Sequence, residues 1–133
     1  MTVPNTVAAG LIDNVTKRGA GSVYLVLLQS DIDPASTTLA TMTEDTTAGG
    51  GRKAVTWTDP STVSPPVSQP TEGVAFGPYT ADMQTAVTTV ALVDAASGTT
   101  GTIRKTWDLG SQFQPKAGDF ITIPAVDLTL GLQ

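Results

Sequence analysis

The chain has 133 residues, which suits one domain whose core needs no metal or disulfide to support it. It contains no cysteine and no histidine, which excludes disulfides and thiolate metal sites and removes the commonest general base and transition-metal ligand. Its formal charge of −5 repels phosphate backbones, so we expect no nucleic-acid partner. No apolar run is long enough to span a bilayer, so we also expect no membrane partner.

The segment from Asn5 to Arg18 predicts a short helix. Apolar residues recur through it at helical spacing, at Val7, Ala8, Leu11, Ile12 and Val15. Asn5 suits the position that caps the start, and Gly19 suits the position after the end. We expect residues 1–20 to form an N-terminal arm and helix, which either covers one end of a sheet or docks on a partner.

Most of the remaining chain predicts β-strands, because short runs of β-branched or alternating apolar residues end at turn-forming residues. These runs are Ser22–Gln29, Arg52–Asp59, Val74–Phe76, Val87–Val93, Thr102–Trp107, Phe120–Ile123 and Val126–Leu130. The first run is continuously apolar, which suits a central strand buried on both faces, or one whose outer face meets another subunit. The proline-rich segment 64–70 suits an edge strand or a polyproline-like connection. The predicted fold class is all-β: an antiparallel β-sandwich with one short N-terminal helix, in a single domain over residues 1–133.

The segment from Ser30 to Gly51 is a long excursion between two predicted strands. A loop of this length inside a compact domain is normally functional or flexible. Leu39 and Met42, three residues apart, are candidates to anchor its middle.

Carboxylates offer little evidence of a reaction or metal centre. Asp31 and Asp33 lie on the same side of an extended segment and could seat a cation, but the further oxygen ligands of a calcium loop are missing, which favours a turn. The remaining candidates fall at predicted strand ends or turns with no paired spacing: Asp82, Asp94, Asp108, Asp119 and Asp127. The glycines at 49–51 precede Arg52 and Lys53 without the spacing of a phosphate-binding loop. Serines have no histidine to activate them, so we expect no enzyme and no bound metal or cofactor.

Four aromatic residues could form a platform that stacks on a sugar: Tyr24, Trp57, Tyr79 and Trp107. Both tryptophans fall in predicted strands, where a sandwich core needs large side chains. This position favours a role in the core over sugar binding.

Nearly the whole chain resembles a family of small tailed-phage virion proteins, labelled tail-fibre-like, minor structural or capsid decoration proteins. The resemblance begins with an N-terminal helix followed by the apolar run Val23–Leu28, and continues through Gly51–Trp57 and Val74–Pro78. Its most specific part is the spacing from Val90–Gly98 to Lys116–Asp119. The proline-rich segment 64–70 departs from the family pattern.

The resemblance implies a non-enzymatic bacteriophage virion structural protein with a jelly-roll sandwich. We expect a capsid decoration (minor capsid) protein, made in the host cytoplasm, that binds the outer capsid surface and stabilises the head. Its partners would be the major capsid protein and itself, as a homotrimer. The alternative is a minor tail, tail-fibre or baseplate protein that binds host-surface carbohydrate. The chain has no coiled-coil or repeat region to build a shaft, which favours decoration.

Four apolar residues outside the predicted strands are candidate partner contacts: Val3, Pro4, Leu39 and Met42. The alternative, which we weigh equally, is that they fold back onto the core of the domain.

Overall fold

The computed structural model describes residues 4–18, 21–30, 32–33, 37–45 and 51–131. The elements in chain order are α1 (Asn5–Thr16), β1 (Val23–Leu28), β2 (Lys53–Val55), the 3-10 helix η1 (Pro60–Thr62), β3 (Val67–Ser68), β4 (Val74–Phe76), β5 (Val87–Val93), β6 (Ile103–Phe113), β7 (Ile121–Ile123), the 3-10 helix η2 (Ala125–Leu128) and β8 (Leu130–Gly131). Within these ranges the chain is mostly β, with one short α-helix, as predicted.

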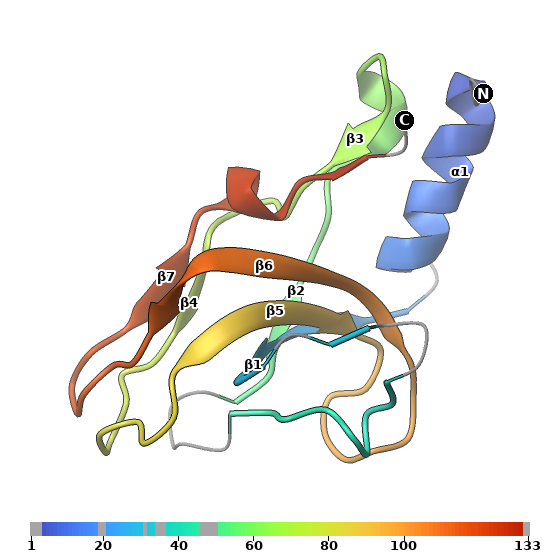
Figure 1. Cartoon of the computed structure of the whole chain (residues 1–133). Coiled ribbons are helices and arrows are strands. Elements are labelled where there is room, and N and C mark those ends of the chain that lie inside the picture. The colour runs from blue at the N-terminus through green and yellow to red at the C-terminus, as the bar shows by residue number, and fades with distance from the viewer. Residues whose placement is uncertain (1–3, 19–20, 31, 34–36, 46–50, 132–133) are drawn as a thin grey trace.

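The strands form one four-stranded sheet in the order β2-β1-β5-β6 and two two-stranded sheets, β3-β8 and β4-β7 (Figure 1). Every pair of neighbouring strands is antiparallel. The predicted antiparallel architecture is therefore confirmed. A jelly roll has eight strands in two sheets, whereas the strands outside the four-stranded sheet form two separate pairs, so the jelly-roll topology stays a prediction.

The two central strands of the four-stranded sheet, β1 and β5, are buried on both faces, whereas the edge strands β2 and β6 are partly buried or exposed. One face packs against the β4-β7 pair, α1 and η2 in the larger core, which includes Leu25, Phe76 and Ile12. The other face packs against the segment 37–45 in a second core, where Leu39 and Met42 contact the sheet. Because both faces are covered, β1 can be apolar at nearly every position, which confirms that it is a central strand.

Helix α1 begins and ends differently from the prediction. Pro4, with non-helical backbone angles, precedes the helix, and its carbonyl accepts a hydrogen bond from the Ala8 N–H at 2.9 Å. Asn5 therefore lies inside the first turn instead of capping it, and its side chain donates to Ser64 Oγ at 2.9 Å. The helix stops at Thr16 because Lys17 adopts a left-handed conformation with φ of 53°. Gly19 lies outside the described residues.

The helix buries one face against its own chain. Ala8, Ala9, Ile12 and Thr16 are its buried residues. Figure 1 shows α1 beside β3, and the helix also contacts η1, β6 and β8. This packing favours the interpretation that the helix covers one end of the structure. None of the helices in the described part of the chain is long and apolar enough to cross a membrane.

The last predicted strand, Val126–Leu130, is wrong over most of its length. Pro124 starts a turn there: its carbonyl accepts from the Asp127 N–H at 3.1 Å, and the Thr129 hydroxyl donates to the Val126 carbonyl at 2.7 Å. These bonds form η2, and only Leu130 and Gly131 pair with β3. The strand predicted from Arg52 to Asp59 also shortens, to Lys53–Val55.

Candidate functional site

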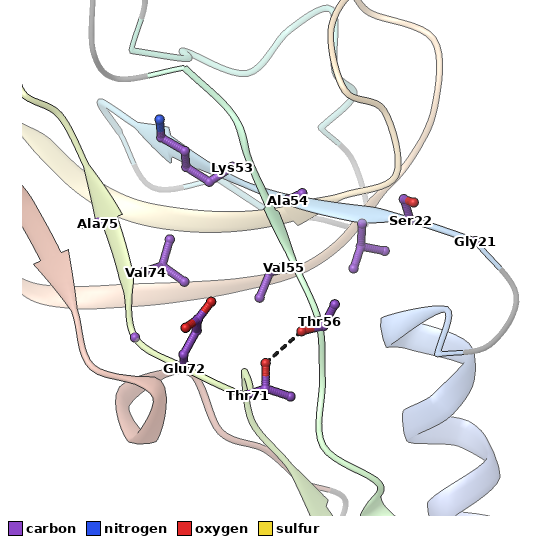
Figure 2. Close-up of a pocket in the computed structure, with 12 residues that line it drawn as sticks. Gly21, Ser22, Lys53, Ala54, Val55, Thr56, Thr71, Glu72, Val74 and Ala75 are labelled. Carbon is purple, nitrogen blue, oxygen red and sulfur yellow. Dashed lines mark hydrogen bonds between the residues drawn. The ribbon is translucent and has the colours of Figure 1, made fainter.

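A groove of about 410 Å³ lies between β2 and β4 (Figure 2). We call it the β2-β4 groove. Its lining comes from the residues before and within β1, from β2 and its continuation, and from the segment leading into β4: Gly21, Ser22, Val23, Lys53, Ala54, Val55, Thr56, Thr71, Glu72, Gly73, Val74 and Ala75.

The groove forms because the segments 56–58 and 69–71 are paired, whereas β2 and β4, which adjoin them, are not paired with each other. After β2, the chain pairs with the segment before β4: Thr71 N–H donates to the Thr56 carbonyl and Thr58 N–H donates to the Gln69 carbonyl, both at 2.9 Å. The hydroxyls of Thr56 and Thr71 are also bonded, at 2.7 Å, and Figure 2 shows this bond closing one end of the groove. Beyond it β2 pairs only with β1 and β4 only with β7, so the groove lies between two open strand edges.

The groove has an apolar floor with one charge of each sign on its walls. Val74 is buried and Val55 is packed against the larger core. Lys53 comes from β2 and Glu72 from the chain before β4, and neither forms an ion pair with another described residue. The hydroxyl and carboxylate groups here have no base or second carboxylate beside them in the lining.

Of the four predicted contact residues, the structure describes Pro4, Leu39 and Met42. Leu39 is 4% exposed and Met42 is 8% exposed, and both pack in the second core with Val26, Leu28 and strand β5. For these two residues the structure favours our second interpretation, that they fold back onto the core. Pro4 is exposed before α1, and Val3 lies outside the described residues.

Arg52 is a residue whose importance the sequence did not indicate. Its guanidinium makes two hydrogen bonds with Glu44, Nε to Oε2 at 3.1 Å and Nη2 to Oε1 at 2.9 Å. It also donates to the carbonyls of Ala95 at 2.9 Å and Gly98 at 2.8 Å. The only sequence signal was a charged residue directly after a glycine run, which is also what a flexible loop looks like.

The aspartates of the candidate list mainly hold turns. Asp94 accepts from the Thr102 N–H and hydroxyl, Asp82 from the Ala117 N–H, and Asp119 from the Lys116 N–H. Asp108 lies within β6, not at its end, and accepts from the Gly110 N–H. Within the described residues no three His, Cys, Asp or Glu side chains gather as a metal site would need. Asp31, part of the cation candidate, lies outside those residues.

The aromatic residues serve the core. Trp57 is buried and stacks on the partly buried Trp107 with ring centroids 6.0 Å apart and an interplanar angle of 16°. Tyr79 is buried, and its hydroxyl donates to Asp45 Oδ2 at 3.2 Å. The core interpretation of the tryptophans is confirmed for Trp57, and no sugar platform is formed by this pair.

The described residues form a β-rich fold with a surface groove between β2 and β4 and with turns that are held by carboxylates. Residues 2–131 match the protein family described as Podophage GP4 fiber I protein gp80. The chain therefore belongs to this family, which confirms the resemblance to tailed-phage virion structural proteins. Searches among curated proteins and among solved structures found no match.

Proposed function

We propose that the chain is a non-enzymatic component of a tailed-phage virion that acts as a module of a fibre. The observation that carries this proposal is the family match over residues 2–131, whose description names a podophage fibre protein. It moves our preference from capsid decoration to the tail-fibre alternative, because the match covers almost the whole chain.

A structural role is also supported by how the reactive groups are used. The chain has no histidine or cysteine. The carboxylates of Asp82, Asp94 and Asp119 accept backbone hydrogen bonds in turns. The two tryptophans stack on each other, and Trp57 is 6% exposed, so Trp57 does not offer a face to a sugar. A host-glycan role for the fibre therefore has no specific support from this pair.

Capsid decoration is the second candidate. It is favoured by the lack of a coiled-coil or repeat pattern within residues 1–133, since such a pattern would build a fibre shaft. In this role the chain would bind the major capsid protein on the outer surface of the head, as a homotrimer. Its binding would raise the temperature at which particles rupture, because a ligand that binds only the intact shell stabilises it by mass action.

The location of the chain on the particle tests the proposal. Virions from a phage with the gene deleted would be imaged beside wild-type virions and beside deletion virions supplied with the protein in trans. We expect density to disappear from tail-associated fibres and to return on complementation. Loss of density from the capsid surface, in a copy number fixed by capsid symmetry and with a lower rupture temperature, would replace the fibre proposal with decoration.

A further inference from the structure

We propose that a shallow pocket beside Phe113 and Phe120 binds a neutral sugar, as one unit of a polysaccharide or glycan. This inference goes beyond the proposed function, because it assigns a ligand to the chain wherever the chain lies on the particle. It rests on three observations: two exposed aromatic rings at one pocket, a turn that is braced beside them, and fixed hydrogen-bond acceptors on the same lining.

The pocket lies at the end of the structure away from α1. It has a volume of about 260 Å³ between the end of β6 and the start of β7, and its lining includes Phe113, Gln114, Asp119 and Phe120. Figure 1 shows the turn between β6 and β7 beside the chain between β4 and β5, at the other end of the structure from α1 and β3. The site is therefore at a tip of the molecule that α1 does not cover.

The two phenylalanines are the aromatic residues that the fold leaves in solvent. Phe113 is 39% exposed and Phe120 is 57% exposed, whereas the other aromatic side chains of the described chain are buried or partly buried. Single exposed apolar residues are ordinary, but ligand pockets are commonly lined by several aromatic rings. An aromatic ring offers a flat apolar face, which suits the C–H face of a sugar ring.

The turn between β6 and β7 is braced by the segment that precedes β5. The Gly118 N–H donates to the Tyr79 carbonyl at 2.7 Å, and the Tyr79 N–H donates to the Asp119 carbonyl at 3.0 Å. The Met83 N–H donates to the Pro115 carbonyl at 2.9 Å. A braced turn loses little conformational freedom when a ligand binds, so more of the contact energy appears as affinity.

Phe120 rests on the backbone of Gly77. A Cβ at Gly77 would lie 3.0 Å from Phe120 Cδ2 and 2.8 Å from the Asp119 carbonyl oxygen, so the ring occupies space that only a glycine leaves free. The ring is therefore supported from one side, while 57% of the residue stays open to solvent.

Polar groups of the lining complement the rings. Gln114 Nε2 donates to the carbonyls of Met83 and Gln84 at 3.1 and 3.3 Å, which fixes the amide and leaves its Oε1 to accept from a ligand. Asp119 Oδ2 accepts from the Lys116 N–H at 3.0 Å, which leaves Oδ1 for the same role. Fixed acceptors beside an apolar face can bind the hydroxyl groups that surround a sugar ring.

The charge and the size of the site favour a neutral sugar over an acidic sugar or a protein. Asp119 lines the pocket and the chain has a formal charge of −5, so an acidic sugar meets repulsion. The two rings expose no more than about 250 Å² between them, since one aromatic side chain has at most about 250 Å². A stable protein interface buries about 800 Å² on each partner, so the rings would supply less than a third of it.

Titration of the isotope-labelled full chain with free sugars, followed by nuclear magnetic resonance, tests the proposal. The neutral probes are the methyl glycosides of glucose, galactose, mannose and rhamnose, together with N-acetylglucosamine, and the acidic probe is N-acetylneuraminic acid. We expect at least one neutral sugar to shift the amide signals of residues 112–121 in a saturable way. We expect the acidic sugar to bind at least about fivefold more weakly, the ratio that one exposed like-charge contact supplies.

Substitutions at the ring separate this site from weak general attraction. Phe120→Ala should weaken binding of the neutral sugar about fivefold, within the range that one aromatic contact supplies. Phe120→Tyr keeps the ring and should keep the wild-type affinity. Val126→Ala is the matched control, because Val126 is apolar and 67% exposed but lies outside the pocket lining. A dispersed amide spectrum shows that each variant folds.

Four outcomes overturn the proposal. If no neutral sugar shifts the signals of residues 112–121, the pocket is not a sugar site. If Phe120→Ala binds as tightly as Val126→Ala, the ring does not contact the ligand. If the acidic sugar binds as tightly as the neutral ones, the neutral class is wrong. If the same signals shift as the concentration of the chain alone rises, the rings form a contact between copies.

Discussion

Arg52 and Glu44 meet through two parallel hydrogen bonds, and the same guanidinium donates to the carbonyls of Ala95 and Gly98. One side chain thus joins the segment 37–45, the start of β2 and the turn after β5. The Arg52 side chain is only 5% exposed, whereas that of Glu44 is 25% exposed. The planar fork of arginine suits this arrangement, because it presents several donors in fixed directions.

We therefore expect Arg52→Lys to destabilise the chain by about 2 kcal/mol, since a lysine cannot replace the fork that bonds Glu44 and the carbonyls of Ala95 and Gly98 from a buried position. Denaturant unfolding followed by tryptophan fluorescence measures the change. Arg18→Lys is the matched control, because Arg18 pairs with Asp13 at 2.8 Å but on the surface. The Arg18 variant should leave the midpoint nearly unchanged. Equal effects of the two substitutions would contradict the role given to Arg52.

The second prediction concerns the buried pair of Tyr79 and Asp45, each about 1% exposed. Tyr79→Phe removes a donor from a buried carboxylate and should cost about 1–2 kcal/mol at neutral pH. Burial first, and then the negative charge of Asp45 and the hydrogen bond to it, raise the pKa of the Tyr79 hydroxyl well above its ordinary value of 10.0. The unfolded chain therefore loses this proton at lower pH than the folded chain, and stability falls as pH rises above about 10.

Unfolding midpoints of both chains between pH 7 and pH 11 check this prediction. The variant should be less stable at pH 7 and should lose less stability above pH 10, because it lacks the titrating group. Tyr24→Phe is the control, since its hydroxyl makes no hydrogen bond with a described residue and its loss should change little. If Tyr79→Phe follows the pH dependence of the wild-type chain, the linkage to Asp45 is wrong.

The sequence predicts those strands whose residues show a clear local pattern, such as β5 and β1. The β-branched run that ends at a turn predicts β5 with its bounds, and the continuous apolar residues of β1 predict a central strand. The segment 126–130 failed because alternation also fits a 3-10 turn followed by two strand residues, which buries Leu128 and Leu130 alike. Pro124 before it was the signal for the turn.

The groove and the Arg52 contacts could not be predicted, because they depend on pairings between distant segments. The groove exists because the chain pairs with the continuation of β2 only up to Thr71, and β4 then pairs with β7 instead. Strand β7 lies nearly fifty residues later in the chain. The acceptors of Arg52 include Ala95, 43 residues away. Leu39 and Met42 are apolar residues outside the predicted strands, and the sequence alone fits a partner contact and the domain's own core equally well. Only their packing against β1 and β5 decides between the two.

The third prediction concerns Asp94, which accepts hydrogen bonds from the Thr102 N–H at 2.6 Å and hydroxyl at 2.8 Å. Burial alone would raise the pKa of this carboxyl, but the Thr102 bonds and the charges of Arg104 and Lys17 outweigh burial and hold the pKa below its ordinary value of 3.8. The stabilisation is therefore present above that ordinary value and is lost as pH falls through the lower pKa of the folded chain.

Asp94→Asn should thus destabilise the chain by about 1–2 kcal/mol at pH 7, and the difference from wild type should shrink below about pH 4. Urea unfolding from pH 7 to pH 2 measures it. Asp127→Asn, in η2, should show no such convergence, because its carboxylate makes no hydrogen bond with a described residue. A gap between wild type and the Asp94 variant that stays constant down to pH 2 would refute the linkage.

The fourth prediction is a stabilising change in α1. Gly10 lies on the exposed side of the helix, and a Cβ built there would have no neighbour within 4 Å. Gly10→Ala should therefore stabilise the chain by about 0.5–1 kcal/mol, because alanine favours the helix and restricts the unfolded chain. Thermal unfolding of the variant and the wild-type chain shows whether the substitution raises the unfolding midpoint. A lower midpoint would mean that the exposed helix face needs glycine for a contact beyond this chain's described residues.

The fifth prediction uses Gly101, in the turn between β5 and β6, as a probe of how tightly this turn packs. Its φ of +135° is one that residues with a Cβ rarely adopt, and an added Cβ would lie 2.5 Å from Asp94 Oδ1 and 3.1 Å from Leu39 Cδ1. Gly101→Ala should cost about 2–4 kcal/mol, since the backbone is strained and the Asp94 carboxylate must move away from Thr102. Gly98→Ala, in the same turn with φ of +78° but open space around the new Cβ, should cost only about 1 kcal/mol. Denaturant unfolding of the two variants separates strain from crowding. If they are equally destabilised, crowding against Asp94 contributes nothing and the turn is looser than the distances indicate.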